Sequence, residues 1–261
     1  MKLLKKKVAI VTGAGSGIGR AIALLFATEG AKVTVSDINE DGCNQTMSEI
    51  NQKGGEAIFI KANCAEPKDN EALVDQTVKN YGALQIAINN AGIGGPLHPV
   101  GDYPIDGWEK VIGINLSGVF YGMRYQIPAM LQSGEGRIVN VASILGQVGT
   151  RFSPAYVAAK HGVVGLTKAA ALEYAQQNIR INSVGPGYIK TPLLDALDEN
   201  VMNGLVSLHP MGVWEHLKKL QSWYYGLAPI KHLLLQELII RLMAVIYLNK
   251  NCMNSTKLYT L

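Results

Sequence analysis

Thr12-Gly13-Ala14-Gly15-Ser16-Gly17-Ile18-Gly19 follows a short apolar run and opens a second apolar stretch that extends to about Glu29. The first run is short and β-branched, which predicts a buried strand, and the second predicts a helix. Gly13 permits the tight turn between them, Gly17 lets the backbone approach a pyrophosphate, and Gly19 lets the helix pack close to the strand. The N–H groups and the positive dipole end of the helix would then face the phosphates. This order of strand, turn and helix predicts a dinucleotide-binding turn, and the alternative is a glycine turn without a ligand.

The rest of the chain, up to residue 211, alternates short apolar runs with helical stretches. Continuous apolar strands that alternate with helices are typical of a parallel sheet covered on both faces and joined by right-handed crossovers. We therefore predict an α/β fold, a doubly wound parallel sheet in a single domain over residues 1–211, followed by an atypical tail over residues 212–261. The expected strands are Lys7–Thr12, Lys32–Ser36, Ala57–Lys61, Leu84–Ile88, Arg137–Ala142 and Ile179–Val184, and the expected helices after the first are 40–53, 68–81, 105–130 and 154–177.

Composition and charge exclude several classes of protein. The chain is 48% hydrophobic and 17% charged, which is enough apolar material for a sizeable core and excludes a disordered protein. Residues 1–211 hold 18 basic and 18 acidic side chains, whereas residues 212–261 hold 6 and 2, so the formal charge of +4 belongs to the tail. Because the charge does not indicate a basic surface stripe, we predict neither a nucleic-acid partner nor a membrane partner.

The cysteines and histidines do not indicate a metal site. Cys43, Cys64 and Cys252 have no metal-ligand spacing and are too few for a disulfide framework. We therefore expect a reduced, cytoplasmic setting. The histidines also lack a cysteine or carboxylate partner at ligand spacing, so no metal is expected at His98, His161 or His209.

Asp37 lies eighteen residues past Gly19, at the end of the second expected strand. A carboxylate at this position accepts hydrogen bonds from both hydroxyls of the adenosine ribose and repels a 2′-phosphate. Neither Ser16 nor Ser36 offers the cation that an NADP pocket would need. We therefore predict NAD as the cofactor, and the alternative is a surface aspartate at a strand end.

Tyr156 and Lys160 are four residues apart in a helical stretch and therefore share one face of the helix. A phenol alone is a poor base at neutral pH, because its pKa is about 10. A nearby ammonium stabilises the phenolate and lowers that pKa, which makes Tyr156 a usable general acid/base. Ser143 follows an expected strand at the carboxyl edge of the sheet, where its hydroxyl could bind a substrate oxygen.

Taken in order, these residues resemble the short-chain dehydrogenase/reductase family, and the similarity runs from about Lys7 to Gly212. The ordered set of motifs is far more specific than any one of them. The resemblance implies an NAD-dependent oxidoreductase that interconverts a secondary alcohol and a ketone by hydride transfer. The matching pieces are Thr12–Gly19, Asn89-Asn90-Ala91-Gly92, Asn115, Ser143, Tyr156-Val157-Ala158-Ala159-Lys160, and Pro186-Gly187 with Thr191.

The resemblance also implies a role for each matched residue. Tyr156 would be the acid/base, Lys160 would lower its pKa and hold the nicotinamide ribose, and Ser143 would orient the substrate oxygen. Asn115 would hold a water in a proton relay to solvent. The other positions would contact the cofactor: Asn63 at the adenine, where the family more often has Asp; Asn90, Ala91 and Gly92 beside the dinucleotide; Ile189 and Thr191 at the carboxamide; and Gly13, Ser16, Gly17, Ile18, Gly19, Pro186 and Gly187 elsewhere along it.

Two alternatives to this function remain open at the level of the sequence. One is a 3-oxoacyl-carrier reductase-like enzyme, which usually needs NADPH and a basic residue where this chain has Ser16. The other is an inactive dinucleotide-binding product, because of the altered C-terminus. The substrate is expected to be a small-molecule alcohol or ketone, and the apolar residues of the loops at 94–104 and 188–211 suggest a moderately apolar one.

The tail after Gly212 departs from the resemblance. The family usually continues with an R-x-G-x-P-E-E-I/V segment and ends on a V-D-G-G strand, and this chain has neither. A second reading frame joins the last base of each codon to the first two bases of the next. In that frame, the codons of Trp214 and Glu215 necessarily encode a glycine between them, and so do the codons of Met243 and Ala244. Both glycines stand at the spacing of the family's pattern. The tail therefore looks frame-shifted, with the last helix and strand of the family replaced, and the alternative is a divergent natural tail. The resemblance implies a homo-oligomer, a tetramer, whose interface depends on those replaced elements.

Overall fold

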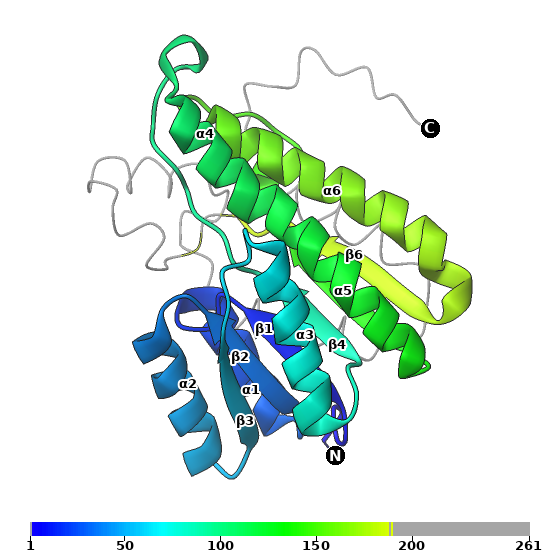
Figure 1. Ribbon diagram of the computed structural model, residues 1–261. Helices are drawn as coiled ribbons and strands as arrows, with labels where there is room; N and C mark the ends of the chain where they lie inside the picture. The colour runs from blue at the N-terminus through cyan, green and yellow to red at the C-terminus, as the bar shows by residue number, and fades with distance from the viewer. Residues whose placement is uncertain (1, 188, 190–261) are drawn as a thin grey trace, which may run out of the picture.

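The computed structural model describes residues 2–187 and 189, and within them six parallel strands form one sheet with helices on both faces (Figure 1). The strand order is β3-β2-β1-β4-β5-β6, so the chain winds outward from β1 in one direction and then in the other. This confirms the doubly wound α/β fold predicted from the sequence. The strands are β1 (Val8–Thr12), β2 (Lys32–Asp37), β3 (Glu56–Lys61), β4 (Ile86–Asn89), β5 (Gly136–Val141) and β6 (Ile179–Val184), and the helices are α1 (Gly17–Thr28), α2 (Glu40–Gln52), α3 (Pro67–Tyr81), α4 (Ile105–Ile112), α5 (Gly118–Gln132) and α6 (Pro154–Tyr174).

Alternate residues of each strand supply two separate apolar cores. Ala9 and Val11 of β1 pack with α1 and α2 on one face, whereas Ile10 packs with α3, α5 and α6 on the other (Figure 1). All three side chains are fully buried. Because both faces of the sheet are covered, the central strands carry no polar alternation, and they read in the sequence as unbroken apolar runs.

The helix expected over 105–130 is interrupted at its centre. α4 ends at Ile112, a π turn spans Gly113–Ser117, and α5 begins at Gly118. A π turn holds one residue more than an α turn and is common at functional sites. The residue at its centre is Asn115, which is fully buried.

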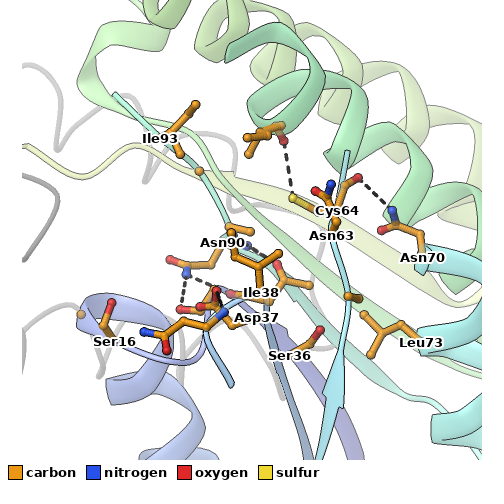
Figure 2. Close-up of a pocket in the computed structure, with 18 of the residues that line it drawn as sticks. Ser16, Ser36, Asp37, Ile38, Asn63, Cys64, Asn70, Leu73, Asn90 and Ile93 are labelled. Carbon is orange, nitrogen blue, oxygen red and sulfur yellow. Dashed lines mark hydrogen bonds between the residues drawn. The ribbon is translucent and has the colours of Figure 1, made fainter. Parts of the chain in front are cut away.

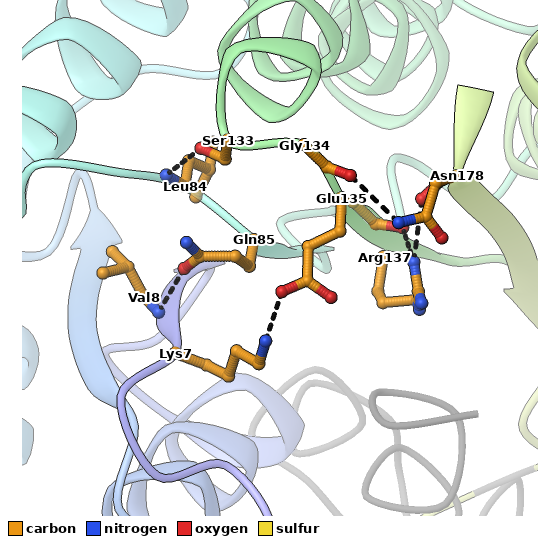
Figure 3. Close-up of polar contacts among 10 residues, drawn as sticks. Lys7, Val8, Leu84, Gln85, Ser133, Gly134, Glu135, Arg137 and Asn178 are labelled. Atoms are coloured by element: carbon orange, nitrogen blue, oxygen red, sulfur yellow. Dashed lines mark hydrogen bonds and ion pairs between the residues drawn. The ribbon is translucent and has the colours of Figure 1, made fainter. Parts of the chain in front are cut away.

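Side chains form polar contacts at the amino-terminal ends of the strands, as Figure 3 shows. The Gln85 side-chain oxygen accepts a hydrogen bond from the Val8 N–H at 2.8 Å, and the Ser133 hydroxyl accepts one from the Leu84 N–H at 3.1 Å. Lys7 forms an ion pair with Glu135 at the same end of the sheet. β4 begins at Ile86, two residues later than predicted.

The predicted tail over residues 212–261, and with it the frame change near Gly212, lies outside the described residues. Within the described part of the chain, no helix combines the length and hydropathy that a bilayer crossing requires. Thr191, expected at the carboxamide, also lies outside the described residues.

Candidate active site

The glycine-rich turn lies at the carboxyl end of β1, where α1 begins. Gly13 has a φ of +64°, and a Cβ on Gly19 would lie 2.2 Å from the Gly13 carbonyl oxygen. Only glycine satisfies both the backbone conformation and this close approach. The Ser16 side chain does not cap α1, and the first turn of α1 holds no acidic residue. The helix therefore presents its backbone N–H groups and positive dipole end without a competing anion.

Thr12 joins this turn to the end of β4. Its hydroxyl oxygen accepts hydrogen bonds from the N–H groups of Asn90 and Ala91, at 3.0 and 3.2 Å. The Asn90 amide in turn donates to the carbonyl oxygens of Thr12 and Gly13, at 2.9 and 3.3 Å. Thr12 belongs to the predicted Thr12–Gly19 turn, but the role of its hydroxyl in joining the turn to the end of β4 is not predicted from the sequence.

A cavity of about 370 Å³ opens along the carboxyl ends of β1 to β4 (Figure 2). Nine of the predicted cofactor-binding residues line it: Gly13, Ser16, Gly17, Ile18, Asp37, Asn63, Asn90, Ala91 and Gly92. Its volume is within the usual range of small-molecule sites. Several other lining residues are not predicted from the sequence, including Ile38, Cys64, Asn70, Leu73, Ile93 and Ile114.

Both carboxylate oxygens of Asp37 are held by backbone donors. One accepts a hydrogen bond from the Gly15 N–H and the other from the Asn39 N–H, each at 3.1 Å. Within the described part of the chain no ion pair neutralises this carboxylate. Asp37 therefore presents a fixed negative charge to the cavity, with a remaining lone pair on each oxygen for a donor.

The wall formed by the end of β3 is uncharged. The Asn63 side-chain oxygen accepts a hydrogen bond from the Ala65 N–H at 3.1 Å, and the Asn70 amide donates to the Cys64 carbonyl oxygen at 2.8 Å (Figure 2). Burial raises the pKa of the Cys64 thiol to about 11, so the thiol is neutral at physiological pH. The surroundings of Asn63 and Cys64 suit a flat, neutral group such as a nucleobase.

Lys160 is the buried cation of the site. Its ammonium donates to the Val141 carbonyl oxygen at 2.7 Å and lies 5.5 Å from the centre of the Tyr156 ring. Burial lowers the pKa of Lys160 to about 8. A Cβ on Gly92 would lie 3.2 Å from the Asn115 side-chain oxygen and 3.8 Å from the Lys160 nitrogen. Residues from the β4 loop, the π turn and α6 thus converge at one point.

The Asn115 amide makes a reciprocal pair with the backbone of Ile93. Its oxygen accepts from the Ile93 N–H at 2.9 Å, and its nitrogen donates to the Ile93 carbonyl oxygen at 2.8 Å. This pairing fixes the orientation of the amide and ties the π turn to the loop after β4.

Ser143 begins a short 3₁₀ turn after β5. Its hydroxyl oxygen accepts a hydrogen bond from the Leu145 N–H at 3.2 Å, which leaves the hydroxyl hydrogen to point elsewhere. The Ile144 N–H donates to the Pro186 carbonyl oxygen at 2.9 Å and so brings the Pro186-Gly187 segment to the same edge. Ile189 is buried in the core on the α1 face.

The fit of these residues to a nicotinamide dinucleotide is good. A Cβ on Gly19 would clash with the Gly13 carbonyl, Asp37 at the end of β2 faces the cavity, and the buried ammonium of Lys160 lies near the Tyr156 ring. Among the described residues, no three histidine, cysteine or acidic side chains gather in a way that could hold a metal ion.

The family model described as short chain dehydrogenase matches residues 7–201 of the chain. The chain belongs to this family. Family membership makes it an oxidoreductase that acts on CH–OH groups and binds a nicotinamide dinucleotide.

Relatives and solved structures agree with this assignment. The cyclohexanol dehydrogenase of Acinetobacter sp. (strain SE19) is 54% identical over 206 residues, which cover 79% of this chain and 81% of that protein. The crystal structure of levodione reductase is 32% identical with a TM-score of 0.83, and the match covers 86% of this chain and 91% of the other. A variant of actinorhodin polyketide ketoreductase solved with NADPH is 34% identical with a TM-score of 0.80, over 85% of this chain and 90% of the other.

Proposed function

We propose that this short-chain dehydrogenase uses NAD to interconvert a secondary alcohol and a ketone, with Tyr156 as the general acid/base. The observation that carries the proposal is the position of Lys160, a buried ammonium 5.5 Å from the Tyr156 ring and beside Asn115. A positive charge at that distance favours the phenolate, which is the form that accepts a proton from an alcohol.

Each neighbour of Tyr156 has a distinct task in this proposal. Ser143 donates its hydroxyl hydrogen to the substrate oxygen, while the Leu145 N–H occupies one of the two lone pairs of that hydroxyl and helps to orient it. The hydrogen bond to the Val141 carbonyl oxygen holds the Lys160 ammonium in place, and its positive charge stabilises the phenolate. Asn115, fixed by Ile93, supports a water on the path of the proton to solvent.

The cofactor is proposed to be NAD because of Asp37. The glycine turn would hold the pyrophosphate, and the Asp37 carboxylate would accept hydrogen bonds from the ribose hydroxyls and repel a 2′-phosphate. When bound, the nicotinamide ring supplies the hydride chemistry, and the protein supplies position and a proton path.

The substrate is proposed to be a moderately apolar, cyclic secondary alcohol. Leu97 and Val100, in the segment between β4 and α4, are 55% and 80% exposed, so this segment offers apolar side chains that a substrate could contact. The closely similar cyclohexanol dehydrogenase supports the same class of substrate.

The test is oxidation of cyclohexanol with NAD by the 261-residue chain, followed as NADH absorbance. Tyr156→Phe should reduce kcat by roughly 100-fold or more, because general acid/base groups contribute about 10²–10⁴-fold, while NADH binding stays intact. Tyr174→Phe, at the far end of α6, is the matched control and should keep wild-type kcat.

Other outcomes separate this proposal from its alternatives. Faster reduction of a 3-oxoacyl thioester with NADPH than of cyclohexanone with NADH would favour the acyl-carrier reductase. Tight NADH binding with no turnover of any alcohol or ketone in a panel would favour the inactive binding product.

A further inference from the structure

The glycine-rich turn has two sides, and only one of them faces the cavity. Gly13, Ser16 and Gly17 line the cavity, whereas Ala14 and Gly15 are buried on the opposite side. That second side rests on β2 and on α2, which packs beside α1 (Figure 1). No residue of α2 itself lines the cavity.

The backbone of Ala14 is bonded on both sides. Its N–H donates to the Ser36 carbonyl oxygen at 3.1 Å, and its carbonyl oxygen accepts from the Thr46 hydroxyl at 2.9 Å. The Gly42 carbonyl oxygen, one turn earlier in α2, also lies 2.9 Å from this hydroxyl, so the two carbonyl oxygens share its single hydrogen. Thr46 is fully buried, so water does not replace either contact.

Gly15 lies against the same two elements, β2 and α2. Its N–H donates to Asp37 at the end of β2, and its carbonyl oxygen lies 2.6 Å from where a Cβ on Gly42 would be. The Gly42 N–H donates to the side-chain oxygen of Asn39, which caps α2 at 3.1 Å. The first turn of α2 therefore lies directly against the middle of the glycine-rich turn.

We propose that Thr46 and Gly42 are positioning residues for the dinucleotide phosphates. They hold Ala14 and Gly15 from behind, so that the N–H groups at the start of α1 keep their direction toward the cavity. A helix that does not touch the cofactor thereby sets the affinity for it. This inference rests on the proposed dinucleotide site and adds to it the β2–α2 unit as its support.

Thr46 could instead be a buried threonine that only stabilises the fold. Thr77 provides the control that distinguishes this role from positioning of the turn. Thr77 is also fully buried on a helix, its hydroxyl bonds the Leu73 carbonyl oxygen one turn earlier at 2.7 Å, and it makes one further contact, to the Thr34 hydroxyl at 3.0 Å. It lies on α3, whose contacts are with the other face of the sheet. Thr46→Val and Thr77→Val thus remove the same chemical groups, and only the first touches the turn.

The experiment titrates NADH and ADP-ribose into the 261-residue chain by calorimetry, with thermal melting as the stability measure. Thr46→Val leaves the Ala14 carbonyl without its partner and should raise Kd for both ligands by about five- to tenfold. Thr46→Ser restores the hydroxyl and should return Kd to within about twofold of wild type. Thr77→Val should lower Tm comparably with no change in Kd.

Gly42→Ala is a second test variant, for which helix propensity and the contact with Gly15 predict opposite effects. Alanine normally favours a helix over glycine, but here its Cβ must push α2 away from Gly15. We expect weaker binding of both ligands, whereas Gly165→Ala in α6, where a Cβ meets open space, should leave Kd unchanged.

Two results would overturn the inference by itself. One is unchanged Kd in both Thr46→Val and Gly42→Ala, and another is an equal loss of affinity in Thr77→Val. If Thr46→Val does not fold, Gly42→Ala decides by itself. A wild-type chain that bound neither NADH nor ADP-ribose would instead overturn the proposed function together with this inference.

Discussion

Asp37→Asn should weaken the preference of the chain for NADH over NADPH by roughly 100-fold. The carboxylate faces the cavity, no ion pair within the described residues neutralises it, and its oxygens are fixed by the N–H groups of Gly15 and Asn39. Because these hydrogen bonds hold the carboxylate in place, its charge would repel a 2′-phosphate on the ribose bound beside it.

The magnitude follows from the charges and their surroundings. Two unit charges about 4 Å apart repel by about 1 kcal/mol in bulk water and about 4 kcal/mol near a protein surface. Asp37 is half-buried at an open cavity, and a phosphate monoester carries about 1.5 to 2 charges. An intermediate value of about 3 kcal/mol corresponds to a factor of roughly 100 in the ratio of the two dissociation constants.

The assay is fluorescence titration of NADH and NADPH into wild type and variant. Asp37→Asn should bring the two dissociation constants close to each other without inverting them, because Glu40 and Asp41 in the first turn of α2 still repel the phosphate. Asp106→Asn removes the same charge from the first turn of α4 and should leave the ratio unchanged.

Wild type that bound NADPH as tightly as NADH would contradict the predicted role of Asp37. An equal loss of affinity for both cofactors in Asp37→Asn would also contradict it, because the carboxylate would then support the turn without selecting the cofactor.

Three further predictions concern stability and the tail. Burial lowers the pKa of Lys160 from 10.5 to about 8, so as the pH rises the folded state releases this proton before the unfolded state does. Between these two pH values, the free energy of unfolding of wild type, measured in urea titrations, should therefore rise relative to that of Lys160→Met. A difference between the two proteins that did not change with pH would contradict this prediction. Gly19→Ala places a Cβ 2.2 Å from the Gly13 carbonyl oxygen and should cost about 1–3 kcal/mol in urea unfolding, whereas Gly165→Ala should not destabilise the chain. Resequencing the coding DNA should reveal one base missing near codon 212. The chain encoded after that base is restored should run as a tetramer on size exclusion. Stop codons in the reading frame that starts one base earlier would exclude the frameshift.

The fold class and many residues of the candidate site could be predicted from the sequence, because these predictions depend on local spacing. Apolar runs alternating with helical stretches required a covered parallel sheet, and glycines at fixed positions after the first run indicated the turn. The four-residue spacing of Tyr156 and Lys160 required a shared helix face. The position of Asp37 at a strand end placed it at the same edge of the sheet as the turn.

The tertiary structure alone decided which distant groups support that site. Thr46 bonds Ala14 across 32 residues, Lys160 bonds the Val141 carbonyl across 19, and Asn115 pairs with Ile93 across 22. None of these pairs follows a helical or strand period, so no local pattern marks it. Each forms because a buried polar group must find a partner, and the partner is whichever group the order of the strands and the packing of the helices bring within reach.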